Sequence, residues 1–183
     1  MSERPAKSRS DEVQRWYEQH GPALVAYASS ILGERSRAED ALQQVFYKLL
    51  KGKMEVTEPE KAYLFRAVRN TALNMTRQSG REVALNDEAA ERGERTARTG
   101  EGWFEAPAEL SYWNSKLESA IRELPPEQSE VLVMRIWGEM KFDEIASVLD
   151  ISINTVASRY RYALATLRER MQPFEVRNEH AAK

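Results

Sequence analysis

The sequence predicts an all-α protein with two small helical domains joined by a flexible acidic linker. Apolar residues recur at intervals of three and four along most of the chain, and no segment shows the period of two that is typical of strands. Residues 82–109 differ: they carry eight acidic residues against three arginines, three glycines and few large apolar side chains. A stretch this long without a clear pattern is unusual inside a compact domain. We therefore interpret it as the linker.

The composition limits the classes of function. The 183 residues include no cysteine and no apolar run that approaches the roughly 20 residues of a membrane span. The first residues, MSERPAKSRSDE, lack the apolar core of a secretion signal. We expect a cytoplasmic chain without disulfides or membrane association. There is no glycine-rich phosphate loop and no ligand cluster with metal-site spacing, so we expect no enzyme activity, no cofactor and no metal.

We expect the N-terminal domain to span residues 11–81 and to begin with two helices. Gly33 follows the apolar segment LVAYASSIL and is placed to end the first helix. Ser36 and Glu39 form an S-x-x-E capping box that predicts the start of the second helix. The second helix carries an apolar stripe: Ala38, Ala41, Leu42, Val45, Phe46, Leu49 and Leu50.

A third helix is predicted over about residues 61–78, ended by Gly80. From Lys61 to Arg81 there are five basic residues and no acid. Helical spacing places these residues on one face: Tyr63, Arg66, Asn70, Asn74, Arg77 and Arg81. It places Leu64, Val68, Ala72 (or Thr71) and Met75 on the face toward the core. Rings and guanidinium groups can stack on unpaired bases while amides bond base edges, so the polar face suits single-stranded DNA. A solvated surface helix is the alternative, although such a helix normally mixes charges of both signs.

The C-terminal domain is expected over residues 110–171, followed by a tail at 172–183. Pro125-Pro126 breaks the helical pattern, and Pro126 suits the first turn of the next helix. The predicted helices are 110–124, 126–137, 142–149 and 153–171.

The last two of these helices fit a helix-turn-helix. Asp150-Ile151-Ser152 forms the turn, and Ser152 is suited to cap the second helix. The residues expected to pack inward are Val156, Tyr160 or Ala163, and Leu167. The outward residues near the start of the helix are Thr155, Ser158, Arg159, Arg161 and Tyr162. Such side chains can meet base edges and phosphates in a DNA groove. An ordinary helical hairpin with a solvated polar face is the alternative.

Three segments carry a resemblance to a known family. ELPPEQSEVLVMRIWGEMKFDEIASVLDISINTVASRYRYALATLRERM resembles the C-terminal, −35-reading domain of bacterial sigma factors of the sigma-70 family, most of all the small extracytoplasmic-function (ECF) group. RAEDALQQVFYKLL resembles the family helix that docks on RNA polymerase, and KAYLFRAVRNTALNMTRQ resembles the helix that contacts the melted −10 element. The resemblance covers roughly residues 11–80 and 110–171.

The resemblance implies a sigma factor that binds core RNA polymerase and promoter DNA, both as duplex and as melted strand. An anti-sigma factor is a further candidate partner. The implied polymerase-binding residues are Asp40, Gln43, Gln44 and Tyr47. The −10 contacts would come from the polar face of the third helix and the −35 contacts from the outward face of the last helix.

This chain departs from the family pattern at several positions. Gln44 stands where glutamate is usual. Basic residues are frequent in the family at the positions of Ala157, Tyr162, Leu164 and Ala165. The alternative function is a stand-alone helix-turn-helix regulator with an N-terminal dimerisation or sensing domain. Such a domain has no need of a face within residues 61–81 whose charged residues are all basic.

Overall fold

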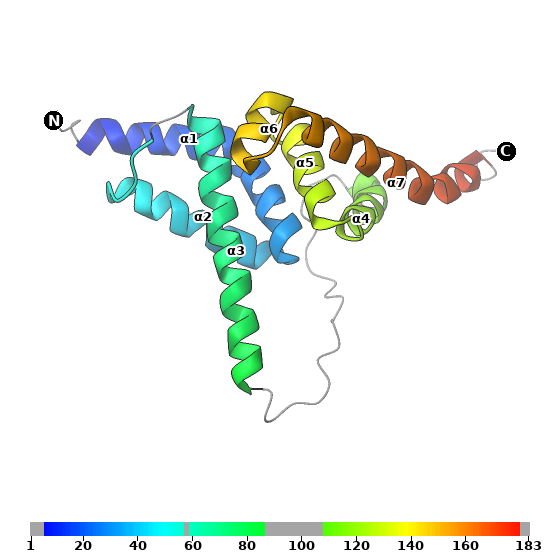
Figure 1. The fold of residues 1–183 in the computed structure, drawn as a ribbon, viewed down its shortest axis with the longest axis horizontal. Coiled ribbons are helices and arrows are strands. Elements are labelled where there is room, and N and C mark those ends of the chain that lie inside the picture. The colour runs from blue at the N-terminus through cyan, green and yellow to red at the C-terminus, as the bar shows by residue number, and fades with distance from the viewer. Residues whose placement is uncertain (1–5, 57–58, 87–107, 180–183) are drawn as a thin grey trace. The chain divides into compact units, whose positions relative to one another are not determined.

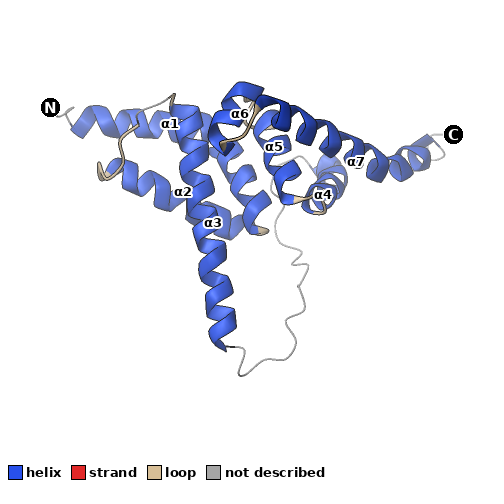
Figure 2. Cartoon of the chain, viewed as in Figure 1, coloured by secondary structure: helices blue, strands red, loops and turns tan. Residues whose placement is uncertain are grey.

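The computed structural model describes residues 6–56, 59–86 and 108–179. Within these ranges every regular element is a helix and no strand occurs (Figure 2). The chain divides into two compact units, Met1–Glu101 and Gly102–Lys183. The prediction of an all-α chain with two helical domains is confirmed. None of the described helices has the length and apolar character needed to cross a bilayer.

The N-terminal unit is a three-helix bundle in which each helix packs against the other two. Its helices are α1 (Ala6–Leu32), α2 (Arg35–Leu50) and α3 (Glu60–Asn86) (Figure 1). In the core, the buried rings of Tyr27 and Phe65 have centroids 5.3 Å apart. Gly33 ends α1 as predicted: its φ is +79°, and its N–H donates to the carbonyl of Ser29 at 2.8 Å. Glycine adopts this left-handed conformation at little steric cost.

The apolar stripe predicted for α2 forms its buried face. Six of its seven members are buried: Ala38, Ala41, Leu42, Val45, Phe46 and Leu49. Leu50 is the exception, because it is the last residue of the helix and is 48% exposed.

The capping box predicted at Ser36 is wrong. The helix begins one residue earlier, at Arg35, with Glu34 in the capping position and no side-chain cap. The Glu39 carboxylate accepts instead from Nε of Arg35, the first residue of the helix, at 2.8 Å. The capping box needed this carboxylate as an acceptor for a backbone N–H. In the structure the carboxylate forms an i to i+4 ion pair with Arg35 instead.

The predicted end of α3 at Gly80 is also wrong, since the helix continues to Asn86. An interior glycine costs a helix only about 1 kcal/mol, and a contact from α2 holds the helix just before this point. Nη2 of Arg37 donates to Oγ of Ser79 at 2.8 Å and to the carbonyl of Met75 at 3.4 Å. The first residues of the expected linker are therefore helical, while residues 87–107 lie outside the described part of the chain.

The C-terminal unit contains four helices, with α7 packed against the other three. They are α4 (Ala108–Arg122), α5 (Pro126–Ile136), α6 (Phe142–Leu149) and α7 (Ile153–Glu179). Pro126 occupies the first turn of α5, as predicted. Ile121, Leu132, Met140 and Ile145 are buried at the centre.

The outer boundaries of this unit differ from the predicted ones. Helix α4 begins two residues before 110, and α7 continues through most of the segment predicted as a tail. An ion pair between Arg170 and Glu123 ties α7 to the residue that follows α4. The charge pattern of α7 alone carries no signal for this contact, because the two residues are far apart in the sequence.

Candidate polymerase and nucleic-acid interfaces

The polar side of α2 is a continuous exposed surface opposite the buried stripe. The four predicted polymerase-binding residues all lie on it: Asp40, Gln43, Gln44 and Tyr47. Tyr47 is 57% exposed, and Nζ of Lys51 lies 5.6 Å from the centroid of its ring. The arrangement offers one carboxylate, two amides and an aromatic ring to a partner.

An aromatic residue from α1 was missed by the sequence analysis. Tyr17 packs the edge of its ring against Phe46 of α2, with centroids 5.2 Å apart, yet half of its surface remains exposed. It places a second exposed tyrosine beside α2. Only the pairing of α1 with α2 reveals this, because nothing in the local sequence distinguishes Tyr17 from the polar residues around it.

The predicted polar face of α3 lies opposite the helix's buried side. Leu64, Val68 and Ala72 are buried, whereas Asn70 and Asn74 are exposed. Arg77 is exposed as well, and Tyr63 and Arg66 are half-buried. At about 100° per residue, these five polar residues fall within a sector of about 80°. The side chain of Arg81 lies outside the described residues.

A buried histidine lies under the first turn of α3. His20 of α1 is 5% exposed, and burial lowers the pKa of its imidazole below 6.5. The nearby positive charge of Lys61 lowers this pKa further, and Glu60 opposes the shift. Among the described residues, no hydrogen-bond partner is present for Nε2 of His20 or for Nε1 of Trp16, one helical turn earlier. The imidazole is therefore neutral near pH 7.

The C-terminal unit contains the predicted helix-turn-helix. Ser152 caps α7 as expected, because its Oγ accepts from the N–H of Thr155 at 3.1 Å. Asp150 makes the turn with a φ of +54°, a conformation that aspartate tolerates better than most side chains. At the start of α6, the N–H of Lys141 donates to the Glu144 carboxylate at 2.6 Å. This bond gives the backbone N–H of Lys141 a partner at the start of the helix.

The inward side of α7 packs largely as predicted. Val156 and Ala163 are buried, and the ring of Tyr160 lies 5.5 Å from that of Phe142 in α6. The guanidinium of Arg135 lies 5.5 Å from the Phe142 ring and donates to the Met140 carbonyl at 2.8 Å. These contacts fix the direction of α7 relative to α5 and α6.

The five predicted −35 residues differ in how they are presented. Arg161 and Tyr162 are exposed, with the Arg161 guanidinium 5.4 Å from the Tyr162 ring. Thr155 and Ser158 are half-buried, and their hydroxyls already take part in hydrogen bonds. Arg159 is half-buried and lies about 60° around the helix from Val156, beside the packed side.

The structure adds one residue to this surface. Asn154, in the first turn of α7, is exposed and lies about 160° from Val156. The sequence analysis overlooked it, although the same helical spacing that placed the other residues could have found it.

Comparison with known protein families finds one matching family model for each of the two units. The family model for sigma-70 region 2 matches residues 16–82, and the one for sigma-70 region 4 matches residues 115–167. The chain belongs to the sigma-70 family. Region 2 of this family therefore corresponds to the α1–α3 bundle, and region 4 to the unit that contains the helix-turn-helix.

Curated relatives cover most of the chain and carry sigma-factor names. RNA polymerase sigma factor SigV of Bacillus subtilis is 25% identical over 151 residues, covering 81% of this chain and 84% of that protein. RNA polymerase sigma-E factor of Streptomyces coelicolor is 28% identical over 163 residues, covering 87% and 86%. ECF RNA polymerase sigma factor SigL of Mycobacterium tuberculosis is 24% identical over 165 residues, covering 87% and 89%. These relatives place this sigma-70 family member in the ECF group.

Two solved structures have the same fold. Sigma factor RpoE of Bartonella quintana, in complex with the anti-sigma factor NepR, superposes with a TM-score of 0.66 at 24% identity. That match covers 88% of this chain and 97% of the other. CnrH, in complex with the cytosolic domain of CnrY, superposes with a TM-score of 0.62 at 20% identity, covering 92% of each chain.

Proposed function

We propose that the chain is a sigma factor that binds core RNA polymerase and directs promoter-specific transcription initiation. The observation that carries this function is the pair of family matches, region 2 and then region 4, each on its own helical unit. The stand-alone regulator is not favoured, because its N-terminal domain would be a dimerisation or sensing domain rather than a sigma region 2. The protein changes no covalent bond in its partners and acts in the cytoplasm, where the polymerase and its DNA template are found.

In this function α2 binds the polymerase. The exposed row of Asp40, Gln43, Gln44 and Tyr47 supports this role, because the opposite side of the helix is fully used by the core of the bundle. This row carries one charge and one large aromatic ring, with the exposed charges of Glu39 and Lys48 at its edges, as in an interface whose centre is poor in charge and whose rim is polar. Tyr17 extends the same surface from α1.

Helix α3 contacts the melted −10 element. Its outward sector presents amides and guanidinium groups and no acid, so unpaired bases can stack and form hydrogen bonds while phosphates are neutralised. Arg37 supports the role indirectly, since it braces α3 at Met75 and Ser79, beside the exposed Asn74 and Arg77.

Helix α7 enters the major groove of the −35 element. Its N-terminal turns are exposed away from α5 and α6, and its direction is fixed by the contacts of Phe142 and Val156. An anti-sigma factor is a further partner. This part of the proposal draws on RpoE and CnrH, both solved with proteins that bind them.

The function is tested by reconstitution. The full chain and core polymerase are mixed with genomic DNA, and transcription starts are mapped with and without the chain. We expect new starts that share two upstream elements and that are absent with core polymerase alone. If the chain instead binds duplex DNA without polymerase and creates no new starts, the regulator is correct.

A further inference from the structure

We propose that Asn154 reads an adenine of the −35 element in the major groove through its side-chain amide. The inference rests on the proposed role of α7 as the helix that enters this groove. Asn154 is not one of the five predicted −35 residues, and we assign it the main base-specific contact.

The position of Asn154 on the helix is the first argument. It lies about 160° from Val156 and about 180° from Ala163, which are the fully buried residues among the α7 side chains that the structure describes. The side chain therefore leaves the helix in the direction opposite to the core. Because it belongs to the first turn, it is on the part of a recognition helix that meets base edges.

The second argument is that the amide is available. Ser152 and Thr155 bond to each other through their hydroxyls at 2.8 Å, and Oγ of Ser158 donates to the Thr155 carbonyl at 3.0 Å. Within the described residues, no hydrogen bond engages the side-chain amide of Asn154, which is exposed. Of these four polar residues, Asn154 alone has a side chain with no internal partner in that part of the chain.

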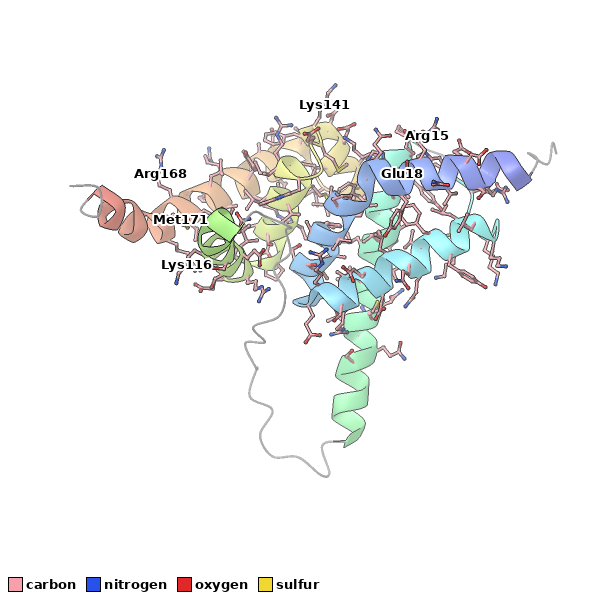
Figure 3. All side chains as sticks on the ribbon, turned by 180° about the vertical axis from the view of Figure 1, so that it is seen from behind. Arg15, Glu18, Lys116, Lys141, Arg168 and Met171 are labelled. Atoms are coloured by element: carbon pink, nitrogen blue, oxygen red, sulfur yellow. The ribbon has the colours of Figure 1, made fainter. Side chains whose placement is uncertain are left out.

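The third argument is clearance. The residues one turn further on, Ala157 and Ser158, are small, so the helix can approach the floor of the groove closely enough for a short side chain to reach a base. Arg161 and Arg168 follow at about 140° and about 120° from Val156. Both are exposed, and Arg168 extends away from α7 (Figure 3), as a phosphate contact at the groove wall requires.

The chemistry of the amide selects adenine. Adenine presents an acceptor, N7, beside a donor, the N6 amino group, whereas guanine presents two acceptors. An asparagine amide carries one donor and one acceptor side by side, so it pairs with adenine through two hydrogen bonds. Arg159, by contrast, leaves the helix about 60° from Val156 and must bend around the backbone to reach the same base pairs.

Promoter selection tests the inference. A library with a randomised −35 region is transcribed by core polymerase with the wild-type chain, and the transcripts are sequenced. We expect one position at which adenine, on either strand, is strongly preferred. Asn154→Ala should reduce that preference roughly 5- to 150-fold and leave the other positions unchanged. The substitution raises helix propensity, so folding should not suffer.

Arg168→Ala is the matched control, because loss of a phosphate contact should weaken all sequences alike. A second measurement isolates the atom: 7-deazaadenine at the selected position removes N7. It should weaken open-complex formation by the wild-type protein and have no further effect on the Asn154→Ala protein.

The outcomes separate this inference from the function on which it rests. If wild type selects a −35 sequence but Asn154→Ala leaves the preferences unchanged, or weakens all sequences uniformly, Asn154 does not read a base. If the wild-type chain prefers adenine at no position of the −35 region on either strand, Asn154 likewise does not read an adenine. If the wild-type chain directs no selective initiation with core polymerase, the proposed function itself fails.

Discussion

The ring of Phe142, at the start of α6, lies edge-on to the ring of Tyr160 in α7, with centroids 5.5 Å apart and planes at 63°. This contact crosses the turn of the helix-turn-helix and joins its two helices directly. The orientation in which α7 is presented to DNA therefore depends on an aromatic pair that does not itself lie on the exposed reading surface.

Phe142→Ala should lower the local stability of the C-terminal unit by about 1–3 kcal/mol, because it removes a half-buried ring and its contacts with Tyr160 and Arg135. Faster amide hydrogen exchange in peptides from α6 and α7 would report this loss. Tyr162→Ala, which removes an exposed ring, is the control and should change stability by less than about 0.5 kcal/mol. Equal protection in the two variants would contradict the role of the pair.

Asp40→Arg should weaken binding to core polymerase about tenfold or more, because it reverses a charge on the exposed side of α2 without touching the buried stripe. Co-elution with core enzyme on size exclusion measures the effect. Asp11→Arg makes the same charge change at an exposed position of α1 and should co-elute like wild type. Normal co-elution of a folded Asp40→Arg protein would remove this surface from the interface.

Replacing Arg66 and Asn70 together by alanine should impair initiation on closed duplex DNA, because both lie on the face of α3 proposed to hold unpaired bases. A template with a pre-melted −10 bubble should recover part of the loss, since it removes an unpairing cost of a few kcal/mol. Transcript yield on the two templates and permanganate reactivity of unpaired thymines are the measurements.

The matched control for this pair is Gln14→Ala with Arg15→Ala. It removes one amide and one guanidinium from exposed positions of α1, where Arg15 projects from the helix (Figure 3). The control should open closed templates normally. Wild-type opening by the Arg66 and Asn70 variant would show that this face of α3 is not the melting surface.

The N-terminal unit should lose stability as the pH falls through 6.5. The pKa of His20 is lowered in the folded protein by burial and by Lys61. The unfolded chain therefore binds more protons below pH 6.5, and protonation favours unfolding. Hydrogen exchange of α1 and α3 between pH 7.5 and 5.5, corrected for intrinsic exchange rates, should show this dependence, and His20→Gln should flatten it. An NMR titration that gives His20 a pKa of 6.5 or higher would contradict the prediction.

The sequence predicted the helices well where one apolar stripe decides the outcome. The spacing from Ala38 to Leu49 placed the core side of α2, and the backbone requirement at Gly33 placed the end of α1. Local sequence signals failed to predict helix ends where a contact with another side chain determines the end. The Arg37 contact that braces α3 before Gly80 joins residues about 40 positions apart, and the Arg35–Glu39 ion pair displaced an equally plausible capping box.

The candidate sites divide in the same way. The exposed sides of α2 and α3 followed from helical spacing alone, because each lies opposite a buried stripe. Tyr17 could not be found, since its place beside α2 depends on how α1 packs against Phe46. The partial burial of Arg159 and the hydrogen bonds of the Thr155 and Ser158 hydroxyls likewise depend on packing, which the sequence alone does not show.

Because α3 continues past Gly80 to Asn86, its last residues are more compact as helix than they would be as extended chain. The seven residues from Gly80 to Asn86 add about 1.5 Å each as helix but about 3.4 Å each when extended. A Cβ at Gly80 would meet nothing within 4 Å, so alanine would fit there and would hold the helix more firmly. Unwinding from the glycine would release about 13 Å, the rise of about four base pairs of DNA. In the proposed function, this released length would let the chain engage two promoter elements that are spaced a few base pairs more widely, with both packed units intact.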